Sequence, residues 1–140
     1  MKNFKSFLLL FFILGLTTTL YAQKVDLAKA EILTSETIDV YYFHFTKRCL
    51  TCNAVESETI NALKKYYAEE LEAGKISFTS MNLDKKVGKD AADKLKVSGQ
   101  SLLIVKGDTK IDLTSQGFMQ ARSNPEKLHE IIKSKIDDLM

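Results

Sequence analysis

Cysteine, histidine and proline are scarce in this 140-residue sequence, which has two, two and one of them, respectively. Two cysteines cannot form a framework of several disulfides, and 45% hydrophobic residues supply enough apolar side chains for a core without one. A structural zinc site needs four ligands, but there is no second C-x-x-C, and only His44 and His129 remain as soft ligands. We expect His44 to pack within a strand beside Tyr42 and His129 to be solvated, with no metal or cofactor bound.

Long apolar runs are also missing, apart from residues 7–16. This run is shorter than the roughly 20 residues that span a membrane. It follows Lys2 and Lys5 and leads to a small residue, Ala22, which is the layout of a secretory signal peptide. An uncleaved membrane anchor is the alternative. We expect residues 1–22 to be removed, no stable membrane span to remain, and the protein to be exported, to the periplasm of a Gram-negative bacterium.

An excess of charge of one sign is absent too. Removal of residues 1–22 takes away Lys2 and Lys5 and no acidic residue, which leaves 18 basic and 18 acidic residues and a formal charge of zero. Nucleic-acid binding loses its electrostatic basis in such a chain. About 118 residues would remain, a length that suits one domain.

The apolar pattern predicts strands alternating with helices. Residues 23–36 are expected to form a short amphipathic lead-in. Strands are predicted over residues 37–45, 76–83, 101–105 and 109–113, and helices over residues 52–73 and 84–95 and from Pro125 onward. Gly107 and Asp108 predict a hairpin turn between the last two strands. This order favours a single α/β domain over residues 37–140, with a mixed sheet flanked by helices.

The most informative motif is Cys49-Leu50-Thr51-Cys52, which lies between a predicted buried strand and a predicted helix. Free N–H groups and the positive end of the helix dipole stabilise a thiolate at such a position, and Lys47 and Arg48 add positive charge. These effects can lower a cysteine pKa from about 8.5 to between roughly 3.5 and 7.5. We therefore expect Cys49 to be the reactive thiol and Cys52, one turn later, the resolving thiol.

Two other interpretations of the pair stay open. It could be half of a zinc site, although the other ligands are lacking. It could also be a static disulfide, since exported proteins keep such bonds. A bridge that closes so short a loop removes little entropy from the unfolded chain, which makes it a weak staple.

The segment Val40-Tyr41-Tyr42-Phe43-His44-Phe45-Thr46-Lys47-Arg48-Cys49-Leu50-Thr51-Cys52, with Val97-Ser98-Gly99-Gln100-Ser101-Leu102 later in the chain, resembles the thioredoxin superfamily. More narrowly, it is similar to the small secreted proteins of the nitrophenyl-compound nitroreductase subunit ArsF family. The resemblance begins near Thr37 and implies a thioredoxin-like fold, with Cys49 as attacking thiol and Cys52 as resolving thiol. Nitroreduction does not follow from it, because the sequence shows no flavin-binding signature.

Three positions depart from ordinary thioredoxins. Leu50-Thr51 replaces glycine-proline between the cysteines, and Phe43 stands where the superfamily keeps a buried acid. Ser101 replaces the usual cis-proline, so we expect a trans Gln100–Ser101 peptide bond, since a cis bond before a non-proline residue costs about 2.5 to 4 kcal/mol. The Ser101 hydroxyl is expected either to point at the Cys49 thiolate or merely to fill a small space.

Three functions are compatible with these residues. The leading one is an exported thiol-disulfide oxidoreductase that acts on cysteine-containing envelope proteins and exchanges electrons with a membrane or soluble thiol-redox partner. The second is a dithiol module that binds a thiophilic ion such as Cu(I) or As(III). The third is a non-catalytic interaction domain with a structural disulfide.

Overall fold

A four-stranded mixed sheet forms the centre of residues 37–140, which are the residues that the computed structural model describes. Its strands are β1 (Ile38–His44), β2 (Ile76–Asn82), β3 (Ser101–Lys106) and β4 (Thr109–Asp112), in the order β2-β1-β3-β4. β1 is parallel to β2 and antiparallel to β3, and β4 is antiparallel to β3. β1 is therefore central, as its nearly continuous apolar sequence predicts.

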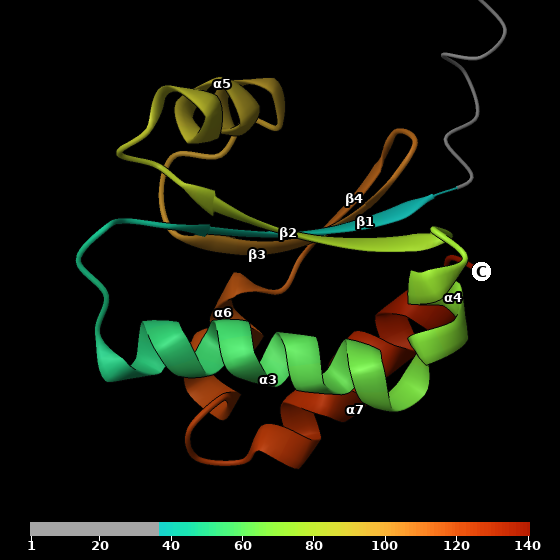
Figure 1. The fold of residues 1–140 in the computed structure, drawn as a ribbon. Coiled ribbons are helices and arrows are strands. Elements are labelled where there is room, and N and C mark those ends of the chain that lie inside the picture. The colour runs from blue at the N-terminus through green and yellow to red at the C-terminus, as the bar shows by residue number, and fades with distance from the viewer. Residues whose placement is uncertain (1–36) are drawn as a thin grey trace, which may run out of the picture. The chain divides into compact units, whose positions relative to one another are not determined.

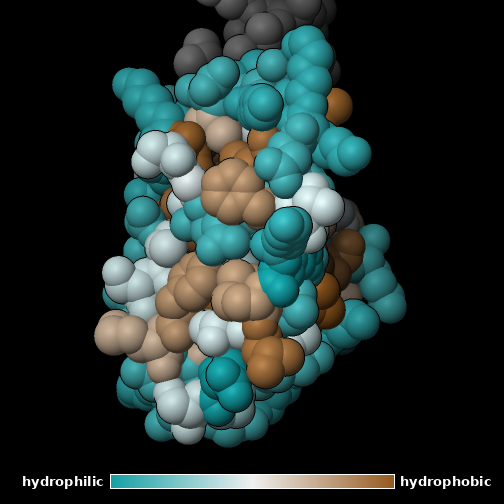
Figure 2. Space-filling view, turned by 90° about the vertical axis from the view of Figure 1, so that its left-hand side faces the viewer, coloured by the Kyte–Doolittle hydropathy of each residue, from teal (hydrophilic) through white to brown (hydrophobic). Residues whose placement is uncertain are grey.

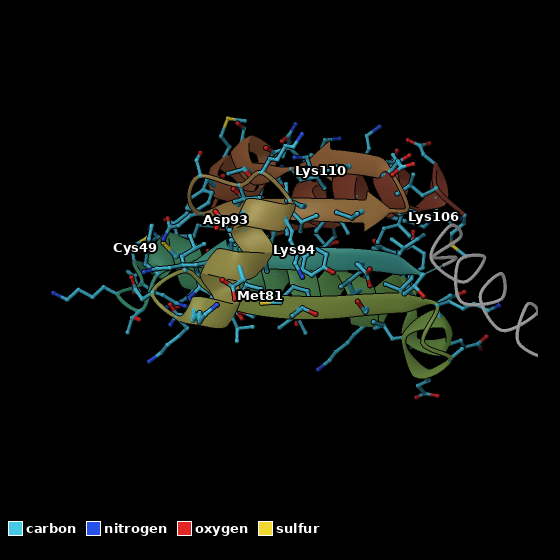
Figure 3. All side chains as sticks on the ribbon, turned by 90° about the horizontal axis from the view of Figure 1, so that it is seen from above. Cys49, Met81, Asp93, Lys94, Lys106 and Lys110 are labelled. Carbon is cyan, nitrogen blue, oxygen red and sulfur yellow. The ribbon has the colours of Figure 1, made fainter. Side chains whose placement is uncertain are left out.

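Five helices cover the two faces of this sheet unequally. They are α3 (Leu50–Tyr66), α4 (Ala68–Glu72), α5 (Lys86–Lys94), α6 (Thr114–Gln120) and α7 (Pro125–Asp137). Figure 1 shows α5 alone on one face of the sheet and α3, α4, α6 and α7 on the opposite face. The view from above in Figure 3 shows α5 lying across the strands.

The side chains of β1 alternate between two hydrophobic clusters, as in any strand buried on both faces. Val40 and Tyr42 belong to the larger cluster, which also contains residues of α3 and α7. Phe43 belongs to a smaller cluster with Leu83, Ala92 and Leu103, on the side of α5. Both clusters contain residues of β1, the strand that precedes the cysteine motif. The end of β1 is therefore held in place by packing on both faces of the sheet.

The predicted strands are confirmed to within one residue at each end. The hairpin turn is confirmed as well: Lys106 pairs with Thr109, and Gly107 has a φ of +53°, a backbone conformation that glycine adopts without strain. The last helix begins at Pro125, after Asn124 caps it by accepting a hydrogen bond from the Lys127 N–H at 3.2 Å. Together these elements confirm a mixed sheet flanked by helices.

The helix predicted over residues 52–73 is wrong in two details. It begins earlier, at Leu50, and it is interrupted at Tyr67, where the backbone leaves the helical region (φ −138°, ψ 34°). The Tyr67 hydroxyl lies 2.9 Å from the Lys133 carbonyl and 2.6 Å from Asp137 Oδ1, both on α7. This contact across the fold accompanies the break, and local sequence periodicity carries no sign of it.

Helix α6 was not expected. Its sequence has no clear apolar period, and Gly117 stands in its middle. A Cβ at Gly117 would lie 3.2 Å from Val55 Cγ1 and 3.4 Å from Leu102 Cδ2, so the missing side chain permits a close approach of α6 to α3 and β3. A tertiary contact thus explains a glycine that in the sequence alone argues against a helix.

The predicted signal peptide (residues 1–22) and lead-in (residues 23–36) lie outside the residues that the structure describes. Within residues 37–140, no helix is long and apolar enough to cross a membrane.

Candidate redox site

Cys49 occupies the N-cap position of α3. Its Sγ accepts a hydrogen bond from the backbone N–H of Cys52 at 3.2 Å. A cap side chain of this kind satisfies one of the N–H groups left free at a helix start. The first turn of α3 carries no acidic residue. Cys49 is exposed, and Figure 3 shows it at one end of the molecule.

Cys52 is buried, with 3% of its surface exposed, and both cysteines are free thiols. Tyr42 of β1 holds this turn of the helix against the sheet, because its buried hydroxyl donates a hydrogen bond to the Cys52 carbonyl at 2.9 Å. Burial raises the pKa of Tyr42, which keeps this hydroxyl protonated as a donor. The structure thus places an exposed thiol and a shielded thiol one turn apart.

The pKa of Cys49 lies below its ordinary value. The causes are hydrogen bonds within the motif, first from the Cys52 side chain, then from the Cys52 backbone N–H and from the backbone of Thr51. Desolvation of the thiol opposes them without reversing the direction. The helix start therefore favours the Cys49 thiolate.

Arg48 binds groups other than the Cys49 thiolate. Its Nη1 forms an ion pair with Glu56 Oε2, and its Nε donates to His44 Nδ1 at 3.0 Å. Its Nη2 lies 3.4 Å from Ser80 Oγ, so one side chain joins β1, α3 and β2. The sequence suggested direct charge support for Cys49, whereas the geometry shows Arg48 holding the loop on which Cys49 stands.

Glu56 is the acidic member of this cluster. Burial opposes ionisation of its carboxyl, but hydrogen bonds from Ser80 and Arg48, together with the charge of Arg48, place its pKa below the ordinary value. The side chains of Arg48 and Glu56 are 21% and 20% exposed. The pair is thus shielded from solvent more than most surface ion pairs are. Lys47 is exposed in the same loop.

Ser101 does not direct its hydroxyl at Cys49. Its Oγ donates a hydrogen bond to the Gly99 carbonyl at 3.1 Å. No cis peptide bond occurs within residues 37–140, so the trans Gln100–Ser101 bond is confirmed. The residue of this loop that contacts the motif is Gln100, whose Nε2 and Oε1 lie 3.6 and 3.8 Å from Cys52 Sγ.

Phe43 lies on the opposite face of the sheet from Tyr42 and the cysteines. The alternation of the strand places Tyr42 under the motif and Phe43 against the cluster on the α5 side. Gln100 and Tyr42 thus contact Cys52, and Glu56 holds Arg48 in the preceding loop; none of these three roles was predicted from the sequence. The signals that could have found them are adjacency to Ser101 for Gln100, the strand period for Tyr42, and the one-turn spacing after Cys52 for Glu56.

The expectation for His44 is correct, and the expectation for His129 is wrong. His44 ends β1 and its ring stacks on that of Tyr42, with centroids 5.9 Å apart, as expected. His129 is buried rather than solvated, at 6% exposure, and its Nε2 lies 2.9 Å from Glu58 Oε2. Packing of α7 on α3 encloses it, although it lies off the apolar stripe of α7. Over residues 37–140, no three His, Cys, Asp or Glu side chains gather to hold a metal ion.

Two large apolar side chains close to Cys49 in the sequence are exposed. Phe45, at the start of the loop that leads to Cys49, is 41% exposed, and Leu50, which follows Cys49, is 73% exposed. Figure 2 views this end of the molecule and shows apolar surface in its middle, between hydrophilic areas. Contiguous apolar areas on a protein surface often mark contact sites for other proteins.

Solved structures with a similar fold include a thioredoxin. Thioredoxin O2 from Arabidopsis thaliana, in its oxidized state, matches with a TM-score of 0.52 and 17% identity over 80% of this chain and 86% of its own. Trxlp from Edwardsiella tarda matches with a TM-score of 0.51 and 17% identity over 76% of this chain and 92% of its own. No protein-family model matches the sequence, and a search of curated proteins finds no match.

These likenesses establish the class of structure. The chain has a thioredoxin-like fold, with a mixed four-stranded sheet between helices and a C-x-x-C pair at the start of α3.

Proposed function

We propose that this protein is a thiol-disulfide oxidoreductase in which Cys49 attacks and Cys52 resolves. The observation that carries the proposal is the pairing of an exposed cysteine, whose Sγ caps α3, with a buried cysteine one turn later. The first has the lowered pKa of a nucleophile, and the second is shielded from other disulfides. The apolar surface formed by Leu50 and Phe45 supports docking of a partner polypeptide beside Cys49.

The reaction consists of two exchanges. The Cys49 thiolate attacks one sulfur of a partner disulfide, and the other partner sulfur leaves as a thiolate that takes a proton from water. Cys52 then loses its proton to water and attacks Cys49 Sγ. The mixed disulfide breaks, its electron pair passes to the partner sulfur, and a Cys49–Cys52 disulfide forms while the partner disulfide is reduced. The reverse sequence oxidises a partner dithiol.

An equilibrium redox titration with insulin reduction as the activity readout tests this function. We expect the wild-type pair to cycle between dithiol and disulfide, and Cys49→Ser to lose insulin reduction. Cys52→Ser should accumulate mixed disulfides through Cys49, whereas Cys49→Ser should trap far fewer. A disulfide that stays oxidised throughout the range of glutathione buffers would identify the bond as structural and contradict the proposal.

We further propose that the protein works outside the cytoplasm, after removal of residues 1–22, with envelope proteins and a membrane or soluble thiol-redox protein as partners. The layout of the first 22 residues supports this location, and the neutral charge balance of the rest supports protein partners over nucleic acid. Membership in the ArsF family remains a proposal that rests on the motif and its preceding aromatic strand. The intact mass of the exported Cys52→Ser protein gives the N-terminus in the same experiment as the trapped partners.

A further inference from the structure

Gln100 contacts the buried cysteine from a distant part of the chain. Its carboxamide Nε2 and Oε1 lie 3.6 and 3.8 Å from Cys52 Sγ, across a sequence separation of 48 residues. The contact exists because β3, which follows Gln100, lies beside β1 in the sheet. A carboxamide has both donors and an acceptor, so it can accept from a thiol and donate to a thiolate.

Other polar groups near Cys52 are engaged elsewhere. The Tyr42 hydroxyl donates to the Cys52 carbonyl rather than to its sulfur, and Arg48 and Glu56 form an ion pair with each other. Phe43 faces the other side of the sheet. Within the part of the chain that the structure describes, the side-chain hydrogen bonds of Cys52 Sγ with measured distances are both with the Gln100 amide.

Cys49 no longer interacts with the Cys52 side chain in the same way once a partner is attached to Cys49. In the dithiol form, a side-chain hydrogen bond from Cys52 is the largest of the causes that lower the pKa of Cys49. When Cys49 is part of a mixed disulfide, its sulfur has no negative charge to accept that hydrogen bond. Cys52 must then become a thiolate in a buried place, where an uncompensated charge is unfavourable.

We propose that Gln100 is a positioning residue for the resolving step, in which its amide N–H stabilises the Cys52 thiolate as that sulfur attacks Cys49. The inference rests on the function proposed above. The proton of Cys52 goes to water, the new bond joins the two cysteine sulfurs, and the electron pair of the broken bond leaves on the partner sulfur. Gln100 takes no proton and forms no covalent bond.

Stopped-flow reaction of the reduced full-length protein with dithiobis(nitrobenzoate) separates the two steps. The first equivalent of coloured thiolate reports attack by Cys49, and its rate depends on reagent concentration. The second equivalent reports resolution by Cys52, and its rate does not. Gln100→Met removes the donor at similar size, and Gln100→Glu replaces it with a negative acceptor. Gln120→Met, at the end of α6, is the matched control.

We expect both Gln100 variants to keep the first phase within about twofold of wild type. The second phase should slow about tenfold at neutral pH, and the midpoint of its pH profile should rise by about one unit, more in Gln100→Glu than in Gln100→Met. Gln120→Met should match wild type in both phases. Because Gln100→Glu is nearly isosteric, it decides the question if Gln100→Met fails to fold by circular dichroism.

Second phases that match wild type in rate and pH midpoint would overturn the role of Gln100 while leaving the proposed oxidoreductase intact. A wild-type protein that releases no second equivalent would instead overturn the two-thiol mechanism itself, and the role of Gln100 with it.

Discussion

At the residue scale, Cys49 takes the place that serine, threonine, aspartate or asparagine commonly fills at a helix start. Its sulfur accepts the Cys52 N–H at 3.2 Å, and the same bond lowers its pKa. Capping and nucleophilicity therefore have one physical origin, which is the set of free N–H groups at the beginning of α3. The nearby arginine contributes differently, through its ion pair with Glu56.

An ordinary cysteine has a pKa of about 8.5. The thiolate of Cys49 should form at a lower pH than this. We expect Ser101→Ala to leave this titration unchanged, because the Ser101 hydroxyl donates to the Gly99 carbonyl rather than to the sulfur. Ultraviolet thiolate absorbance measures both curves, with Cys49→Ser as the blank. A shift of about half a unit or more in Ser101→Ala would show that the hydroxyl does reach the thiolate.

At the element scale, the helix that carries the cysteine motif, α3, is held in place by its packing on α7. His129 of α7 is buried, and its Nε2 lies 2.9 Å from Glu58 Oε2 of α3. Tyr67, after the last residue of α3, lies within hydrogen-bonding distance of two α7 groups. Polar contacts at both ends thus set how α7 lies along the helix that carries the cysteines.

A double-mutant cycle tests the coupling of these helices. We expect His129→Leu and Glu58→Ala to show a coupling of about 1 to 2 kcal/mol in the free energy of unfolding, since the hydrogen bond involves a carboxylate and is largely enclosed. The exposed pair Lys127 and Glu130 on α7 is the control, with an expected coupling below about 0.5 kcal/mol. Equal couplings in urea denaturation would show that burial adds nothing to the His129 contact.

At the scale of the whole molecule, three carboxylates accept hydrogen bonds that connect different elements of the fold. Glu56 binds Arg48, Asp84 accepts the Thr46 N–H at 2.8 Å, and Asp137 binds Lys133 and the Tyr67 hydroxyl. The pKa of each of these acids lies below its ordinary value, and hydrogen bonds to the ionised form are the common cause that lowers it.

Stability should therefore fall in acid. A carboxyl group whose pKa is lower in the folded state stabilises that state above its unfolded pKa, and this contribution is lost as the pH falls through the folded pKa. We expect the free energy of unfolding in urea to stay nearly level from pH 7 to about pH 5 and to decrease from there to about pH 3. Glu56→Gln should lessen this dependence, and a stability that stays flat over the range would contradict the assignment.

The sequence by itself determined the order of the four strands in residues 37–140, the helices between them, the last helix, and the position of the cysteine motif. A strand buried on both faces reads as a continuous apolar run, and Gly107-Asp108 and Pro125 mark a turn and a helix start by their own backbone preferences. These features depend on neighbours within a few residues. These local features place Cys49 between a strand and a helix. Most of the proposed chemistry depends on that position.

Only the tertiary structure decided which side chains meet the cysteines. Gln100 reaches Cys52 across 48 residues, Arg48 turns to Glu56, and His129 is enclosed although it lies off the apolar stripe of its helix. Helix α6 likewise depends on a close approach that Gly117 allows. Each of these outcomes depends on which elements pack together and at what distance, and no local period of the sequence carries that information.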